Sequence, residues 1–452
     1  MNPVLRLRLW LHRASPRAKL GVAGIIVVVI AVVVVAVVVT SGANNGTSVS
    51  AGPASGGSVN CQASATPVKV GVVLAAVGNG GALNVALGLP SVNEQKADFQ
   101  AVFDNVNATG GAKCHQLQPI FQAFNYLDPS STETSCLNLV QAGVIAMLGG
   151  YSATSTNDCP LQHDIAVFDN GTVLLPSELQ HFYPYYFGTN VGLLYNDFAH
   201  VAASAGYFTT KLGTGKLGVA YRDCVPQRVD LLVADLNAVG VQNDRLSRFD
   251  LGCPSAYPSP ATLEQAVLQF KQAGVTVAVS IADSDMPALT QTAEQQGFRP
   301  QWAMPDESVI ATTIAPKASK PNPTDFDGAF VVAGSRYGED PSAATDAATT
   351  ECNAIMAKAG LERIATSPAY YAGAACDYVW TLRAAVADAQ SPVSADLAAG
   401  LQKQGSLQLA FPAGPTRFDK GDTFSNGDWR VVRFEGSCGC WTVPDPTFHA
   451  SF

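Results

Sequence analysis

Residues 144–176 read VIAMLGGYSATSTNDCPLQHDIAVFDNGTVLLP, and this stretch decides the fold. It begins with a short apolar run, Val144 to Leu148, which stops at Gly149-Gly150 and is typical of a fully buried parallel strand. A polar loop and a helix-length segment follow, and we expect the next strand at Thr172 to Leu175, before Pro176-Ser177-Glu178. This order predicts a βαβ unit, in which the loop after each strand lies at the carboxyl edge of the sheet.

The loop after the first of these strands is rich in small hydroxyl residues. Tyr151, Ser152 and Thr154 stand there, with Ala153 between them. Hydroxyl groups and the free N–H groups of a helix start are suitable donors for an anion such as a carboxylate. Ser and Thr also commonly cap the following helix, so both roles stay open for Ser152 and Thr154. We interpret the stretch as the ligand-gripping half of a two-lobed binding protein.

The N-terminal segment predicts membrane attachment. Five basic residues precede Leu20 to Val39, which carries no charge. A helix of about 20 residues spans roughly 30 Å, the thickness of a bilayer's hydrocarbon core, whereas a cleaved signal peptide usually has an apolar region of about 7–15 residues. The length favours an uncleaved signal anchor, with a cleaved and secreted form as the alternative. Residues 1–19 would be a cytoplasmic basic segment, 20–39 a transmembrane anchor in the cell membrane, and the rest extracytoplasmic.

The charge of the exported part argues against nucleic acid as a partner. Five of the 27 Lys and Arg residues precede the anchor and none of the 36 Asp and Glu residues does, which leaves 22 basic against 36 acidic side chains. Such a surface repels phosphate backbones. Residues 40–65 are small, polar and uncharged, and we expect them to form a flexible tether.

The ten cysteines all follow the anchor, where an oxidising compartment favours disulfides. The sequence does not fix their connectivity. From the order of the expected elements we suggest the pairs Cys61–Cys114, Cys136–Cys159, Cys224–Cys253 and Cys352–Cys376. Cys438 and Cys440 would then form a tight ring or stay as two free thiols. A metal site is not expected, because no paired CxxC occurs and His449 alone near the CxC is insufficient.

Beyond the tether the pattern alternates strands with helices. VKVGVVLA (68–75) is expected as the first strand, EQKADFQAVFDNV (94–106) as an amphipathic helix and LQPIFQAF (117–124) as the second strand. A second alternating series begins at LGVAY (217–221). Two such series predict an α/β protein with two lobes, each a parallel sheet flanked by helices.

Several of these pieces, taken in order, carry a family resemblance. They are VKVGVVLA, AVFDNVNATGGAKCHQLQPIFQAF, MLGGYSATS, YYFGTNVGLLYNDFAHVAA, KLGVAYRD, QFKQAGVTVAVSIADS and FPAGPTRFDKGD. In this order the chain resembles the type I periplasmic binding-protein fold, and in particular the branched-chain amino-acid (Leu/Ile/Val) binding proteins of ABC importers. The resemblance implies two discontinuous lobes joined by three crossovers. Lobe 1 would be 66–189 plus 308–389, and lobe 2 would be 190–307 plus 390–452.

The resemblance also implies ligand-binding residues. The family's carboxylate-binding groups map onto Ser152 and Thr154, beside Tyr151 and Ala153, and the groups after its fourth strand map onto Ser177 and Glu178. The acid that meets the ligand's ammonium resembles Asp306 after Pro305, and Asp283 is a second candidate. Charge-assisted hydrogen bonds of this kind suit an amino acid. Asp283, Asp306 and Glu178 are equally compatible with solvated surface acids.

The chain departs from the family after the strand LGVAY. The family usually has a Tyr-Gly pair there, whereas this chain has Arg222-Asp223. Arg222 would pair either with an acidic ligand or with Asp223. The loop after the first strand, 78–95, is also unusually long and apolar. Both changes bear on ligand specificity and leave the fold intact.

Two functions are compatible with these features. The first is a membrane-tethered solute-binding protein that captures an amino acid-like small molecule and passes it to an ABC permease; the second is a ligand sensor or interaction module on the same fold. No cofactor and no catalytic residue is expected, since the sequence lacks a Gly-x-Ser-x-Gly elbow, a His-Glu-x-x-His motif and a phosphate loop, although dispersed Ser, His and Asp residues can still converge in space.

Overall fold

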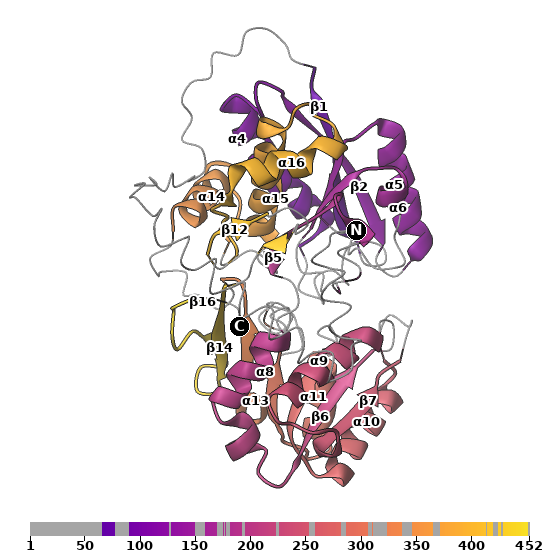
Figure 1. Cartoon of the computed structure of the whole chain (residues 1–452), viewed down its shortest axis with the longest axis vertical. Coiled ribbons are helices and arrows are strands. Elements are labelled where there is room, and N and C mark those ends of the chain that lie inside the picture. Colours follow the sequence, from indigo (N-terminus) through magenta and orange to yellow (C-terminus); the bar gives the residue numbers. More distant parts are fainter. Residues whose placement is uncertain are drawn as a thin grey trace, which may run out of the picture. The chain divides into compact units, whose positions relative to one another are not determined.

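The expected alternation of strands and helices folds into two sheets with helices on their faces. The structure is a computed structural model of the whole chain (Figure 1). It describes residues 66–76, 90–125, 128–149, 159–169, 175, 177, 181–191, 195–222, 226–252, 258–281, 286–305, 310, 323–336, 346–364, 371–412, 414–418, 424–425 and 428–450. All of these residues belong to the compact unit 51–452.

The first sheet is parallel throughout its described strands. Its order is β13-β5-β4-β3-β1-β2, with β1 at Val68–Ala76, β2 at Leu117–Asn125, β3 at Ala146–Leu148, β4 at Ala166–Asp169, β5 at Tyr186–Val191 and β13 at Phe424–Ser425. Strand β1 is buried at every position but Lys69. A near-continuous apolar strand of this kind is covered on both faces, as expected for a parallel sheet between helices.

The helices of the first lobe come from two separate parts of the chain. They are α4 (Val92–Ala108), α5 (Pro129–Ala142), α6 (Cys159–Gln162), α14 (Ala347–Lys358), α15 (Tyr371–Asp388) and α16 (Ser394–Gln404). Helix α15 packs on α4 and α16 and also contacts β3, β4 and β5, while α5 contacts β1 and β2. The lobe is therefore discontinuous, as the resemblance implied.

The second sheet has the order β15-β14-β10-β9-β8-β6-β7, with β16 paired to β14. Its strands are β6 (Lys216–Tyr221), β7 (Leu246–Asp250), β8 (Val275–Ser280), β9 (Gln301–Met304), β10 (Phe330–Ala333), β14 (Asp428–Glu435), β15 (Cys440–Thr442) and β16 (His449–Ala450). The strands from β10 to β7 are parallel, whereas β14 pairs antiparallel with β10, β15 and β16. A two-stranded sheet of β11 (Ser406–Leu407) and β12 (Thr416–Arg417) completes the described strands.

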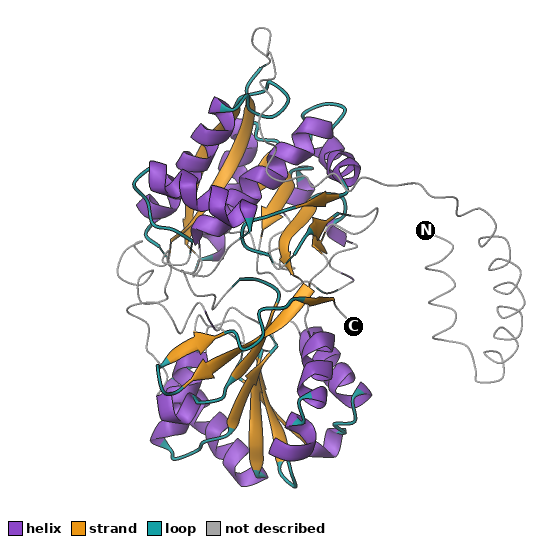
Figure 2. Cartoon of the chain, turned by 90° about the vertical axis from the view of Figure 1, so that its left-hand side faces the viewer, coloured by secondary structure: helices purple, strands orange, loops and turns teal. Residues whose placement is uncertain are grey.

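Helices flank this second sheet on both faces (Figure 2). They are α8 (Tyr195–Ser204), the π-helical turn Tyr207–Lys211, α9 (Pro226–Ala238), the 3-10 turn Asn243–Arg245, α10 (Pro260–Ala273), α11 (Met286–Gln295) and α13 (Pro323–Phe326). Helix α8 and the π-helical turn are separate, because Gly206 adopts a left-handed conformation (φ 75°) between them.

Local sequence signals set the helix ends. The hydroxyl of Ser91 accepts from the backbone N–H of Glu94, and the Glu94 carboxylate accepts from the backbone N–H of Ser91 at 2.6 Å, which forms a capping box for α4. Helix α10 begins with the cap Ser259 before Pro260 and ends at Gly274, whose φ of 72° suits glycine. The predicted helix 94–106 is thereby confirmed as the core of α4.

One predicted strand is wrong. We expected the strand after β3 at Thr172 to Leu175, but the strand that pairs with β3 and β5 is Ala166–Asp169. Leu175 is not in a strand, and 172–174 lie outside the described residues. Both runs are apolar, and the Asp-Asn-Gly turn signal after Phe168 separates them. Pairing with two neighbours across the sheet selects the earlier run, because only register with those strands satisfies its backbone groups.

The elements depart from the predicted division into lobes at three places. Strand β13 lies after residue 389 but pairs with β5 of the first sheet. Strand β10 lies within 308–389 but joins β9 and β14 of the second sheet. Helix α16 lies after residue 389 but packs on α15 of the first lobe.

Three disulfides join described cysteines. Cys136–Cys159 connects α5 to α6 and Cys352–Cys376 connects α14 to α15, as predicted, and Cys438–Cys440 forms the tight ring rather than two thiols. Cys114 is also in a disulfide. Its suggested partner Cys61, and the suggested pair Cys224–Cys253, lie outside the described residues and stay predictions.

No helix within the described ranges is long and apolar enough to cross a membrane. The predicted anchor 20–39 and the tether up to residue 65 lie outside those ranges, so both stay predictions.

The buried carboxyl of Asp98 makes the stability of the first lobe depend on pH. Burial raises its pKa to about 7, with smaller contributions from Glu94 and Glu362. A carboxyl whose pKa is raised on folding makes its full contribution to stability below the pKa of the unfolded state, near 3.8. This contribution is lost as the pH rises through the pKa of the folded state. Asp98→Asn, which stays neutral, should gain stability relative to wild type between about pH 4 and pH 7, by up to about 4 kcal/mol.

Urea unfolding at a series of pH values measures this effect. Asp104→Asn is the matched control, because Asp104 is exposed on the same helix. A difference between Asp98→Asn and wild type that does not change with pH would contradict the assignment.

Candidate functional site

The carboxyl edges of the two parallel sheets position the predicted ligand-binding segments. In the first sheet β3 ends at Leu148 and β4 at Asp169; in the second, β8 ends at Ser280 and β9 at Met304. The nominated residues follow these strand ends in the chain. In open α/β sheets, ligands bind beyond this edge.

The structure places two of the nominated residues. Arg222 is half-buried and directly follows β6 at the carboxyl edge of the second sheet. Ser177 is exposed, and the segment 170–176 separates it from the end of β4. The mapping assumed that Ser177 directly follows the fourth strand, and in the structure it does not. The other nominated residues lie outside the described residues and stay predictions: Tyr151, Ser152, Ala153, Thr154, Glu178, Asp283 and Asp306.

Asp169 is a residue at this edge that the sequence analysis missed. It is the last residue of β4 and is 3% exposed. The Tyr378 hydroxyl of α15 donates to its Oδ1 at 3.5 Å, and the Thr189 hydroxyl donates to its carbonyl oxygen at 3.3 Å. An acid directly after the apolar run Ala166 to Phe168 was the available signal, and the misplaced strand concealed it.

Gln95 fixes both ends of the long apolar loop after β1. Its side chain is fully buried. The amide oxygen accepts from the backbone N–H of Ala75 at 2.8 Å, and the amide nitrogen donates to the carbonyl oxygens of Ala75 at 2.8 Å and Pro90 at 2.9 Å. One side chain thus joins the end of β1 to the start of α4. Residues 77–89, which connect these ends, lie outside the described residues.

Among the described elements, the chain passes between the two lobes three times. It does so between β5 and α8, between β10 and α14, and between β13 and β14. The second crossover is joined by backbone contacts to the first-lobe segment between β11 and β12: the N–H of Arg336 donates to the carbonyl oxygen of Phe411 at 3.0 Å, and Ser335 forms an isolated bridge with Pro412.

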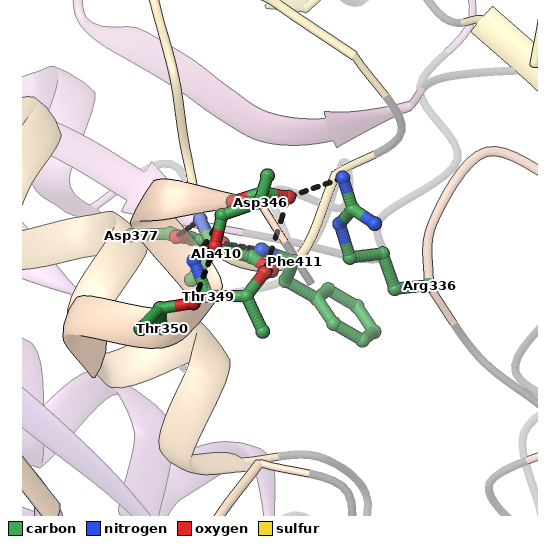
Figure 3. Close-up of polar contacts among 7 residues, drawn as sticks. All are labelled: Arg336, Asp346, Thr349, Thr350, Asp377, Ala410 and Phe411. Carbon is green, nitrogen blue, oxygen red and sulfur yellow. Dashed lines mark hydrogen bonds and ion pairs between the residues drawn. The ribbon is translucent and has the colours of Figure 1, made fainter. Parts of the chain in front are cut away.

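The carboxylate of Asp377 fixes the backbone of the segment that contacts the second crossover (Figure 3). Asp377 lies on α15 and is 1% exposed. Its Oδ1 accepts from the N–H of Ala410 at 2.6 Å and its Oδ2 from the N–H of Phe411 at 3.1 Å. Burial raises the pKa of Asp377 well above its usual range, and the two backbone donors offset this in part.

Asp346 extends the network to the start of α14. Its carboxylate forms an ion pair with Arg336 and accepts from the N–H of Thr349 at 2.9 Å as the helix cap. The Thr349 hydroxyl donates to the carbonyl oxygen of Ala410 at 2.8 Å. The second crossover therefore shares one hydrogen-bonded cluster with α14, α15 and the segment between β11 and β12.

Comparison with known proteins assigns the family. A family model described as periplasmic binding protein matches residues 67–438. The chain belongs to the periplasmic binding protein family. The resemblance seen in the sequence is thereby confirmed. No relative matches among curated protein sequences.

Solved structures of periplasmic binding proteins share the fold. A substrate-binding protein from Desulfitobacterium hafniense in complex with Leu is 16% identical to this chain, with a TM-score of 0.58. The match covers 84% of this chain and 100% of that protein's chain. A solute-binding protein from R. palustris in complex with 4-hydroxybenzoate is 12% identical with a TM-score of 0.64, covering 86% and 98%. A leucine-binding protein from Thermotoga maritima is 13% identical with a TM-score of 0.60, covering 85% and 98%.

Replacing Asp377 with Asn should destabilise the protein. The Asn amide nitrogen would face one of the two backbone N–H groups and leave it without an acceptor, at a cost of about 1–3 kcal/mol. The difference in unfolding free energy between wild type and Asp377→Asn should be largest in mildly acid solution. It should shrink as the pH rises, because a raised pKa means that wild type loses stability through that range. Urea unfolding tests this, with the exposed Asp230→Asn as control; equal stability of Asp377→Asn and wild type at pH 5 would contradict it.

Replacing Gln95 with Leu should cost about 2–4 kcal/mol of unfolding free energy, because buried backbone groups of Ala75 and Pro90 lose their partners. Gln100→Leu is the matched control on the same helix, since the half-buried Gln100 donates to the exposed side chain of Asp104 rather than to the backbone. Chemical unfolding that shows equal losses for both variants would refute the role of Gln95.

Proposed function

We propose that the chain is an extracytoplasmic solute-binding protein that captures a small polar ligand between its lobes by hinge closure. The observation that carries this proposal is the pair of sheets whose parallel strands end at the proposed ligand-binding segments, joined by three crossovers, the second of which is fixed to the first lobe by one buried hydrogen-bonded cluster. Hinge closure around a ligand requires such a junction, because a few residues must absorb the motion while each lobe stays rigid.

The proposed ligand is an amino acid or a related amide or carboxylate. Leu and 4-hydroxybenzoate, the ligands in the two complexes above, both contain a carboxylate. We assign the carboxylate to Ser152 and Thr154, with Tyr151 and Ala153 beside them and Ser177 and Glu178 as further contacts. An ammonium group would meet Asp306 or Asp283. Arg222, at the carboxyl edge of the second sheet, would instead favour a ligand with an additional acidic group.

Delivery to an ABC permease at the membrane completes the proposal. The uncharged segment 20–39 would hold the protein at the membrane through the tether 40–65. The same segment favours a second candidate function, a membrane-bound ligand sensor or interaction module, since a carrier does not need a spanning anchor. Co-purification with a permease complex favours the carrier, and co-purification with a signalling protein favours the sensor.

Thermal unfolding of the protein against a panel of amino acids, amides, aromatic acids and short peptides tests ligand capture. A ligand at 100 times its Kd should stabilise the folded state by about 2.7 kcal/mol and raise Tm. One chemical class should give this shift and the others should not. No shift with any compound on folded protein would reject ligand capture in favour of the interaction module.

The variants Ser152→Ala and Asp306→Ala test the assigned site. Each should abolish the ligand-induced shift, because each removes a side-chain group that we assign to the ligand. Ser204→Ala and Asp230→Ala, at exposed positions of α8 and α9, are the controls and should retain the shift. A full shift in both site variants would place the ligand elsewhere.

A further inference from the structure

Residues 443–450, here called the strap, follow β15 and run along β14, beyond the segment that matches the family model, 67–438. Strand β16 of the strap pairs antiparallel with β14, which places Ala450 opposite Asp428 and His449 opposite Trp429 (Figure 1). The Trp429 indole N–H donates to the carbonyl oxygen of Ala450 at 3.1 Å. The rings of Trp429 and His449 are stacked with centroids 4.8 Å apart.

A turn within the strap supports this conformation. The carboxylate of Asp445 accepts from the backbone N–H of Thr447 at 2.9 Å and lies 3.8 Å from Nε2 of His449. The hydrogen bonds from Thr447 lower the pKa of Asp445, with a smaller contribution from His449. The strap is therefore an ordered structure and has contacts of its own.

The half-buried ring of Phe448 reaches two arginines that belong to the junction of the lobes. Its centroid is 4.6 Å from the guanidinium carbon of Arg430, a residue that is 1% exposed, and 5.7 Å from that of Arg336. Arg430 lies on β14 opposite Ala333, the last residue of β10, and Arg336 follows on the same crossover. Attraction between a cation and an aromatic face strengthens when the pair is removed from water.

Arg336 transmits this contact to the other lobe. Its backbone N–H donates to Phe411, and its guanidinium forms the ion pair with Asp346 at the start of α14. The Phe448 ring therefore packs against a residue of the second crossover that is bonded to the first lobe by both its backbone and its side chain.

We propose that the strap restrains the hinge, with Phe448 as the residue that positions Arg336 against Asp346. The strap thereby regulates how readily the lobes move when a ligand is captured. The functional meaning of this restraint rests on the proposed function, whereas the restraint itself is a property of the ligand-free chain.

Hydrogen exchange of the full chain without ligand, measured by mass spectrometry, tests the restraint. In Phe448→Ala, peptides that contain the amides of Arg336, Ala410 and Phe411 should exchange about threefold to tenfold faster than in wild type, while β1 and β2 stay unchanged. Phe448→Leu, which keeps apolar volume without an aromatic face, should give most of this effect and serves as the second variant if Phe448→Ala does not fold.

Phe208→Ala is the matched control, because Phe208 is a half-buried phenylalanine of the second lobe in the π-helical turn, outside the crossovers. It should leave exchange at Arg336, Ala410 and Phe411 unchanged. Faster exchange confined to 443–450, or faster exchange spread equally over β1 and β2, would overturn the proposal. The exchange experiment uses no ligand, so its result does not depend on whether a ligand is found. The proposal of ligand capture and the proposal of the strap can therefore fail independently of each other.

Discussion

The buried carboxylate of Asp377 is the constraint on which the connection of the two lobes depends. The irregular segment between β11 and β12, which contacts the second crossover, cannot satisfy its own backbone groups as a helix or sheet does, and unsatisfied buried N–H groups are costly. Asp377 supplies both missing acceptors, to Ala410 and Phe411, from the rigid helix α15. Phe411 then accepts from Arg336, which fixes the second crossover to this segment of the first lobe. Burial disfavours the ionised carboxylate and raises its pKa, so the stability of this hydrogen-bonded cluster depends on pH.

The same principle operates at the edges of the sheets. Parallel strands bring their carboxyl ends to one edge, and the segments that follow need anchors in the rigid part of the lobe. Gln95 provides one anchor for the segment between β1 and α4, with three hydrogen bonds from a single buried amide. The close contact between Tyr378 and Asp169 provides another at the end of β4. Polar side chains of α4 and α15 thus fix the strand ends at the edge of the sheet where we propose that the ligand binds.

Much of this fold follows from local signals in the sequence. The apolar strand at Val68 and the helix 94–106 were predicted because neighbouring residues determine them, and the pairs Cys136–Cys159 and Cys352–Cys376 were suggested by the order of the expected elements. The position of β4 was missed because two apolar runs compete, and only pairing with β3 and β5 decides between them. Asp377 carries no local signal at all: it stands in an alanine-rich helix, and its partners are distant in the chain. The site loops follow from strand order, whereas the contacts of their side chains with a ligand do not.

Differential scanning calorimetry of the full chain tests most directly whether Asp377 couples the lobes. If the shared cluster joins them, the protein should unfold in one transition whose calorimetric enthalpy equals its van't Hoff enthalpy, and the transition should separate into two in Asp377→Asn. Two separate transitions in the wild-type protein, each unaffected by Asp377→Asn, would show that the lobes unfold independently and would contradict the account.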